Sequence, residues 1–146
     1  MRYIKLFEEM DIIDANEFRD YCEMNLAYFL DDDSVKLNII NYKPRIIDWF
    51  GVELLFENTK SWTEISDYII PFYYNLEKNY HLKDEGLIHL KNILENGITK
   101  DLFYSIKEGR FRSWGKVKWY DYPIDKLRKI SQIEILLDTD KKSLTK

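Results

Sequence analysis

Apolar residues recur at helical spacing in the first long segment of the chain. The buried stripe that this spacing predicts consists of Phe18, Cys22, Leu26 and Phe29. Asp14 stands at the N-cap position and Glu17 follows three residues later, which is the acidic form of a capping box. The pattern predicts a helix over residues 14–30.

A second helix is predicted over residues 61–80, which open with another capping box, Ser61 and Glu64. Its apolar face consists of Ile65, Ile69, Phe72, Leu76 and Tyr80. Pro71 lies inside this pattern and removes one backbone donor, so we expect either a kink or two helices with Pro71 at the start of the second.

The remaining helical patterns are shorter. Residues 84–97 resemble a helix that is capped by Asp84 and ended by Gly97. Residues 99–108 resemble a short helix, and residues 123–130 one or two helical turns.

Strand-like alternation predicts the rest of the fold. Residues 34–42 alternate with period two, residues 51–57 form a candidate neighbour, and residues 132–137 form a further strand. Residues 2–8 fit either a short strand or the approach to a helix. The sequence therefore predicts an α+β fold with several helices on a small sheet, and a mostly α fold is the alternative.

The length of the chain and its low content of glycine and proline indicate how many domains it forms. The chain has 146 residues with five Gly and three Pro, and it contains no repeat, low-complexity tract or linker. We expect one compact domain over residues 1–138, followed by a polar tail, residues 139–146, that frays.

The composition limits the class of protein and its cellular compartment. A hydrophobic fraction of 45% excludes general disorder, and a single cysteine, Cys22, excludes a disulfide framework within one chain. The N-terminus lacks the pattern of a secretory signal. No apolar run approaches the ~18–20 residues that span a bilayer. We expect a cytoplasmic protein with no membrane partner.

The net charge of −4 is unevenly distributed. Residues 1–40 carry 4 basic and 10 acidic groups, and residues 101–146 carry 11 basic and 7 acidic groups. Such polarity favours a charged partner or head-to-tail association of two copies, so a homo-oligomer stays open.

The strongest candidate for a binding surface is the stretch GRFRSWGKVKWYDY, residues 109–122. As one strand, or as a hairpin about Ser113–Trp114–Gly115, it places Phe111 and Val117 on an apolar face and its basic residues opposite. The predicted contact residues are Arg110, Arg112, Trp114, Lys116, Lys118 and Tyr120. A face that binds anions and stacks flat rings is one interpretation; a solvated sheet edge is the other.

Two large apolar residues in a predicted loop, Trp49 and Phe50, form a second candidate contact. Such residues either fold back onto the core or meet a partner.

Candidate chemistry is sparse. His81, Glu85 and His89 have the spacing of a metal site on one helical face, but the predicted cap at Asp84 leaves His81 outside the helix. The run Asp31–Asp33 lacks the glycine and later glutamate of a calcium loop. The chain contains no phosphate loop, nucleophile elbow or Cys/His pair in a known motif. We expect no metal and no cofactor, and a catalytic pair among the carboxylates stays open.

The opening MRYIKLFEEM, together with the Lys-, Ile- and Asn-rich usage of the chain, resembles small uncharacterised proteins of tailed bacteriophages. The resemblance implies a phage or mobile-element protein made in a bacterial cytoplasm. It carries over no fold and no functional residue.

These observations favour a non-catalytic binding protein that engages a host macromolecule, with a host protein as the preferred partner, as an inhibitor or immunity protein does. Nucleic-acid binding through residues 109–122 is the first alternative, and a virion structural role is the second.

Overall fold

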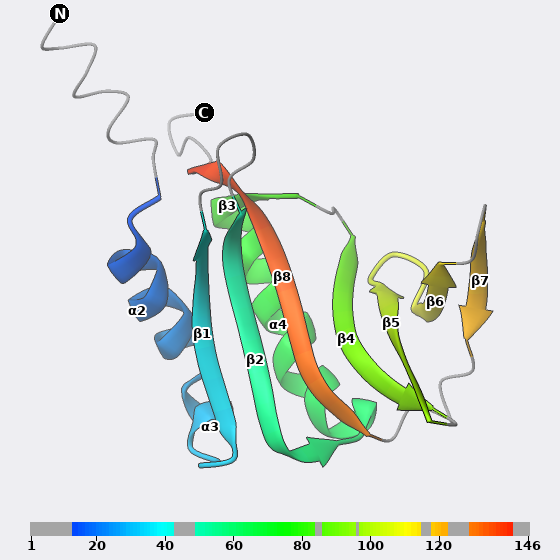
Figure 1. Ribbon diagram of the computed structural model, residues 1–146. Helices are drawn as coiled ribbons and strands as arrows, with labels where there is room; N and C mark the ends of the chain where they lie inside the picture. The colour runs from blue at the N-terminus through cyan, green and yellow to red at the C-terminus, as the bar shows by residue number, and fades with distance from the viewer. Residues whose placement is uncertain are drawn as a thin grey trace, which may run out of the picture.

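The structure, a computed structural model, describes residues 13–42, 49–83, 86–95, 97–114, 118–122 and 129–141. These residues form one α+β domain that is mostly sheet (Figure 1). The helices are α2 (Ala15–Asn25), α3 (Ala27–Leu30) and α4 (Trp62–Asn79). The strands are β1 (Val35–Tyr42), β2 (Trp49–Lys60), β3 (Tyr80–Leu82), β4 (Leu87–Glu95), β5 (Ile98–Ser105), β6 (Arg110–Trp114), β7 (Trp119–Tyr122) and β8 (Ile130–Lys141).

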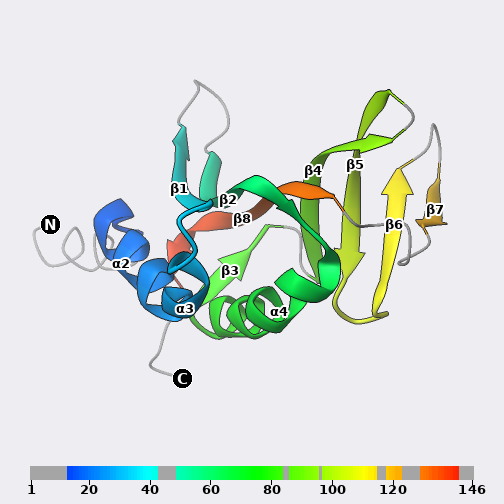
Figure 2. The same cartoon turned by 90° about the horizontal axis from the view of Figure 1, so that it is seen from below.

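The eight strands form one antiparallel sheet in the order β1-β2-β8-β4-β5-β6-β7, and β3 pairs with β8. The α+β prediction is confirmed, whereas the expected small sheet is a large one. Figure 2 shows the three described helices on one side of the sheet. None of the helices in the described ranges is long and apolar enough to cross a membrane.

The core lies between this helical layer and the sheet. Directly paired residues of antiparallel strands point to the same face, so each row across the sheet is buried or open as a unit. The central buried row consists of Leu54, Ile133, Leu90 and Leu102. The next buried row consists of Val52, Ile135, Ile88, Tyr104 and Phe111. Helix α4 covers both rows with Ile65, Ile69, Phe72, Tyr73 and Leu76.

Both predicted capping boxes are confirmed at their N-caps. Asp14 accepts hydrogen bonds from the backbone N–H groups of Asn16 and Glu17, and Ser61 accepts one from Glu64. The first predicted helix is divided at Leu26, yet the buried stripe continues across the division from Cys22 to Phe29. Cys22 is a buried thiol, as expected, and burial raises its pKa to about 12.

Pro71 lies inside one continuous helix, so the expectation of two helices is wrong. Proline removes the hydrogen bond to the carbonyl four residues earlier, here that of Asp67. Asp67 and Pro71 are both exposed. Water can therefore hydrate the carbonyl, and the helix continues.

Two predicted helices are strands instead. Residues 87–95 and 98–105 form the hairpin β4–β5, not the helices predicted over 84–97 and 99–108. The reason for the first error is a bulge: the register shifts between Leu90 and Ile93, and Asn92 adopts a φ of 58°. The extra residue brings Ile93 back to the face of Leu90, which imitates the three-residue spacing of a helix.

The ends of several predicted elements also differ. Glycine at position 97 turns the β4–β5 hairpin with a φ of 76° and does not end a helix. Strand β8 begins at Ile130 and extends past residue 138 to Lys141, into the segment predicted to fray. Of the helical turns predicted over residues 123–130, residues 123–128 lie outside the described residues, and Ile130 begins β8, so the prediction is wrong at its last residue. The predictions for residues 2–8 lie outside the described residues.

One glycine is required by packing. A Cβ at Gly51 in β2 would lie 2.2 Å from the backbone oxygen of Ile135 in β8. The backbones of β2 and β8 are therefore too close at this position to leave room for any side chain larger than that of glycine.

Candidate functional site

The predicted contact stretch forms the hairpin β6–β7 at one end of the sheet. The pairing of β6 with β7 continues to Trp114 and Trp119, so the hairpin does not turn about Ser113–Trp114–Gly115 as predicted. Phe111 is fully buried, whereas Arg110 and Arg112 alternate with it and point to the opposite face of the sheet. The predicted division of the strand into an apolar and a basic side is confirmed for these three residues.

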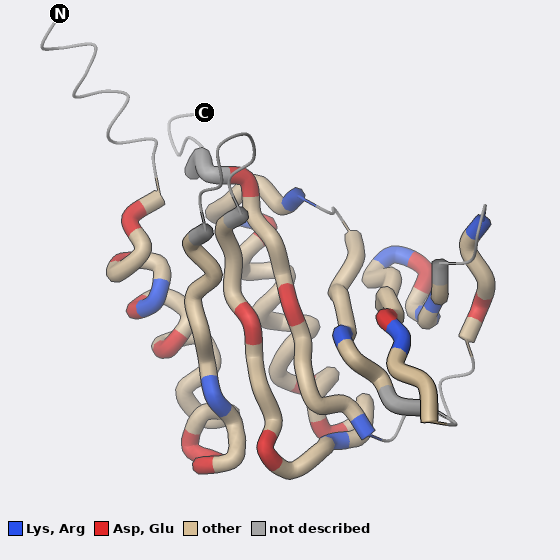
Figure 3. The backbone as a smooth tube through the Cα atoms, in the orientation of Figure 1, with Lys and Arg blue, Asp and Glu red and all other residues tan. Residues whose placement is uncertain are grey.

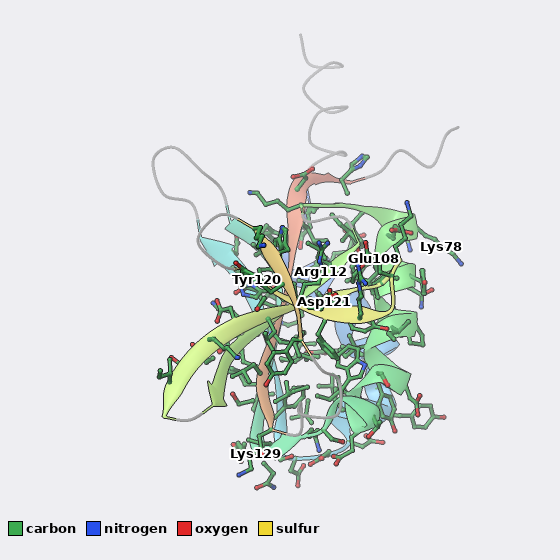
Figure 4. The ribbon with its side chains drawn as sticks, turned by 90° about the vertical axis from the view of Figure 1, so that its right-hand side faces the viewer. Lys78, Glu108, Arg112, Tyr120, Asp121 and Lys129 are labelled. Carbon is green, nitrogen blue, oxygen red and sulfur yellow. The ribbon has the colours of Figure 1, made fainter. Side chains whose placement is uncertain are left out.

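The two arginines, Arg110 and Arg112, do not share a surface with Tyr120. Tyr120 pairs with Ser113, so it shares the helix-covered side of the sheet and lies across the sheet from Arg112. The Lys118 ammonium lies 5.2 Å from the centroid of the Tyr120 ring. Figure 4 views the hairpin from its own edge of the molecule, with Arg112, Tyr120 and Asp121 labelled.

Acidic neighbours neutralise one of the two arginines. The Nε of Arg110 donates to Glu108 at 2.8 Å and lies 3.4 Å from a carboxylate oxygen of Asp121. Arg112 lies over Trp119, with 5.6 Å between the guanidinium carbon and the ring centroid. The stretch is therefore less basic at its surface than its sequence indicates.

The other sequence candidates fall in different places. Phe50 is buried and packs on Phe18 with ring centroids 5.3 Å apart, so it belongs to the core and is not a surface contact. The side chains of Trp49, Trp114 and Lys116 lie outside the described residues. His81 is on β3 and His89 on β4, so the helical metal spacing does not exist in this fold.

The sheet face opposite the helices carries a polar row that sequence patterns did not identify. We call it the open row, and it consists of Asn38, Glu53, Glu134, His89, Phe103, Arg112 and Asp121. Figure 3 shows charged positions near the middle of β2, β8 and β4.

His89 is the centre of the open row. Its Nε2 lies 3.0 Å from Asp101, and its Nδ1 lies 3.7 Å from Glu134. The β4 bulge positions Asp101, because the N–H of Asn92 donates to the other oxygen of this carboxylate at 3.0 Å. Lys91 reaches Glu134 at 3.2 Å. Both ring nitrogens thus face carboxylates, an arrangement that favours the protonated imidazolium.

The pKa values reflect this arrangement. Burial opposes the charged form of His89, but the carboxylates of Glu134 and Asp101 outweigh it, and the pKa of His89 is raised. The contact with His89 lowers the pKa of Glu134. Burial opposes ionisation of Asp101, yet the bonds from Asn92 and His89 lower its pKa.

This cluster predicts a stability maximum in mildly acidic solution. The contribution of His89, whose pKa is raised on folding, is complete below about pH 6.5 and is lost as pH rises through its folded pKa. The contributions of Asp101 and Glu134 are complete above about pH 4–5 and are lost as pH falls. Between pH 6 and 9 the melting temperature should fall about 2–4 °C further in the wild type than in His89→Gln. Equal pH profiles of the two proteins in thermal unfolding would contradict this.

A third surface lies on the outer side of α2 and α3. Residues 13–34 carry seven carboxylates and one basic residue, Arg19. Two large apolar side chains are exposed among them, Met24 at 78% and Tyr28 at 85%. We call this the acidic helical surface, and it consists of Asp20, Glu23, Met24, Tyr28 and Asp31.

The helical repeat explains why these residues share one side. Asp20, Met24, Tyr28 and Asp31 each follow a residue of the buried stripe by two positions, which is about 200° around the helix axis. Because the buried stripe continues across Leu26, the outer side does so too. Figure 3 shows the acidic positions along α2 and at the turn after α3.

One carboxylate near this surface has a structural role. Asp32 accepts hydrogen bonds from the backbone and hydroxyl of Ser34 and from Lys60 at 2.8 Å. These contacts, that with Lys60 first, lower its pKa. Asp32 therefore anchors the turn between α3 and β1 to the end of β2.

No protein-family model, curated protein or solved structure matches the chain.

Proposed function

We propose that this chain is a non-catalytic binding protein whose acidic helical surface docks on a basic surface of a host protein. The observation that carries the proposal is the exposure of Met24 and Tyr28, two large apolar side chains, among carboxylates. Large exposed apolar side chains within a polar rim are typical of interface centres, and tyrosine is enriched among the residues that dominate binding energy.

Charge supports a basic partner. The carboxylates of the acidic helical surface would attract lysine and arginine side chains over several ångströms and orient the encounter. In the phage or mobile-element setting that the N-terminal resemblance implies, the partner is a protein of the bacterial cytoplasm. Blocking a basic functional surface is how an inhibitor or immunity protein of this charge would act.

The test is capture from a nuclease-treated bacterial lysate with matched variants. The wild type and the control Tyr74→Ala/Ile98→Ala should retain the same basic protein, whereas Met24→Ala/Tyr28→Ala should lose it. Tyr74 and Ile98 suit the control because they are 46% and 70% exposed and lie outside the acidic helical surface. The retained protein is then purified and its binding measured by calorimetry. Equal retention by all three proteins, or none by any, would overturn the proposal.

A further inference from the structure

A hollow of about 730 Å³ opens beside the hairpin β6–β7. It is lined by Thr99, Lys100, Asp101, Phe103, Ser113 and Trp119. The hollow lies where β5 extends beyond its pairing with β6, which covers Leu102 to Ser105 of β5. Its volume falls in the range of sites for small molecules.

Aromatic rings form one wall of the hollow. Phe103 stacks on His89 with centroids 4.4 Å apart and an interplanar angle of 13°. Trp119 meets Phe103 edge to face at 5.0 Å and 90°. His89 is itself fixed by Asp101 and Glu134, so the ring wall is preorganised. A fixed aromatic wall favours a ligand with a flat ring.

Arg112 brings a positive charge next to the hollow, beside its lining residue Trp119. Its guanidinium lies over Trp119, and its Nε is buried without a hydrogen-bond partner. A buried donor that lacks an acceptor is costly, so an anion that draws the guanidinium toward it recovers this energy. Arg110, two residues earlier, already contacts Glu108 and Asp121. The two arginines therefore differ in their capacity to bind an anion.

The remaining groups fit a ligand that combines a ring with an anion. Lys100 also lines the hollow, but its Nζ lies 4.5 Å from the centroid of the Tyr122 ring, which shares the helix-covered side with Phe111, so Arg112 is the cation on the side of Phe103 and Trp119. Both carboxylate oxygens of Asp101 are engaged, one by Asn92 and one by His89, which weakens its repulsion of an anion. The hydroxyl of Thr99 can donate or accept hydrogen bonds at the edge of a base or at a sugar, whereas Ser113 shares the helix-covered side with Leu102 and Tyr120.

We propose that this hollow binds a nucleotide, with the base against Phe103 and Trp119 and the phosphate at Arg112. The nucleotide can be a free mononucleotide or one unit of a single strand. The proposal rests on residues other than those of the acidic helical surface, so either proposal can fail without the other.

Isothermal titration calorimetry on the full chain tests this site. The probes are the four ribonucleoside monophosphates, their nucleosides, inorganic phosphate and a single-stranded oligonucleotide. At least one monophosphate should bind the wild type more tightly than its nucleoside and more tightly than phosphate. Arg112→Gln and Trp119→Leu should each weaken this binding about tenfold or more, whereas Trp119→Phe, which keeps a ring, should retain most of it.

The matched control is Arg110→Gln, which removes a neighbouring arginine that is already paired. This variant should bind the nucleotide with an affinity within about twofold of the wild type, because the Arg110 guanidinium is already paired with Glu108 and Asp121. Stronger binding of the oligonucleotide than of the monophosphates assigns the site to single strands, and the reverse assigns it to free nucleotides. If Trp119→Leu does not fold, the comparison of nucleotide affinity between Arg112→Gln and Arg110→Gln tests the proposal by itself. Absence of nucleotide binding at millimolar concentration, or equal losses in the two arginine variants, overturns the proposal.

Discussion

Replacing Phe111 by alanine should lower the free energy of unfolding by about 3–5 kcal/mol, because a fully buried ring leaves a cavity when it is removed. Phe111 contacts Trp62 at 5.0 Å and Tyr104 at 5.0 Å between ring centroids. Trp62 is the first residue of α4, and Tyr104 lies in β5. Phe111 thus connects the hairpin β6–β7 to the helical layer.

The matched control lies on the other strand of the hairpin. Tyr120 is 47% exposed, so Tyr120→Ala should change stability by less than about 1 kcal/mol. Urea unfolding followed by circular dichroism measures both variants, with the denaturant slope as the check that unfolding stays two-state. A loss below about 1 kcal/mol in Phe111→Ala would show that the hairpin does not pack on the body of the domain.

Replacing both Met24 and Tyr28 by alanine should weaken binding to the captured partner about 30-fold or more, which is about 2 kcal/mol. Both side chains are mostly exposed in the unbound protein, so their loss should leave the melting temperature nearly unchanged. A loss of affinity without a loss of stability separates a contact role from a folding role. The measurement is calorimetry of the purified pair beside circular dichroism of the variant.

Charge gives this prediction a second readout. Asp20→Lys/Glu23→Lys should slow association and reverse the effect of salt on the association rate, because it replaces attraction to a basic partner by repulsion. Asp32→Asn is not a suitable charge control, since Asp32 holds Lys60 and Ser34. An unchanged affinity in Met24→Ala/Tyr28→Ala would exclude the acidic helical surface as the interface centre.

The helical layer could be predicted from the sequence because its signals are local. Asp14 with Glu17, and Ser61 with Glu64, mark the two helix starts, and the stripe from Phe18 to Phe29 identifies the buried side. These patterns depend on residues within a few turns of each other.

The hairpin β4–β5 was harder to predict because a bulge hides its alternation. The bulge at Asn92 gives Leu90 and Ile93 a helical spacing, and glycine after the strand resembles a helix stop. A local signal was nonetheless present: Asn96–Gly97 is the dipeptide most typical of a two-residue hairpin turn. This dipeptide favours two strands joined by a turn over two helices.

The sites depended on pairings that no local pattern contains. His89, Asp101 and Glu134 come from three strands and meet through the register of the sheet. The neutralisation of Arg110 depends on Asp121 in the next strand. The sequence did indicate the acidic N-terminal part and the basic hairpin, but the exposure of Met24 and Tyr28 required the structure.

Hydrogen–deuterium exchange of the chain, alone and in complex with the captured protein, tests whether the acidic helical surface is the interface. Slower exchange on binding should be concentrated in residues 15–31, which form α2, α3 and the start of the following turn. The peptides that cover β4–β8 should exchange at the same rate with and without the partner. Protection on the open row or on the hairpin β6–β7, with none in residues 15–31, would contradict it.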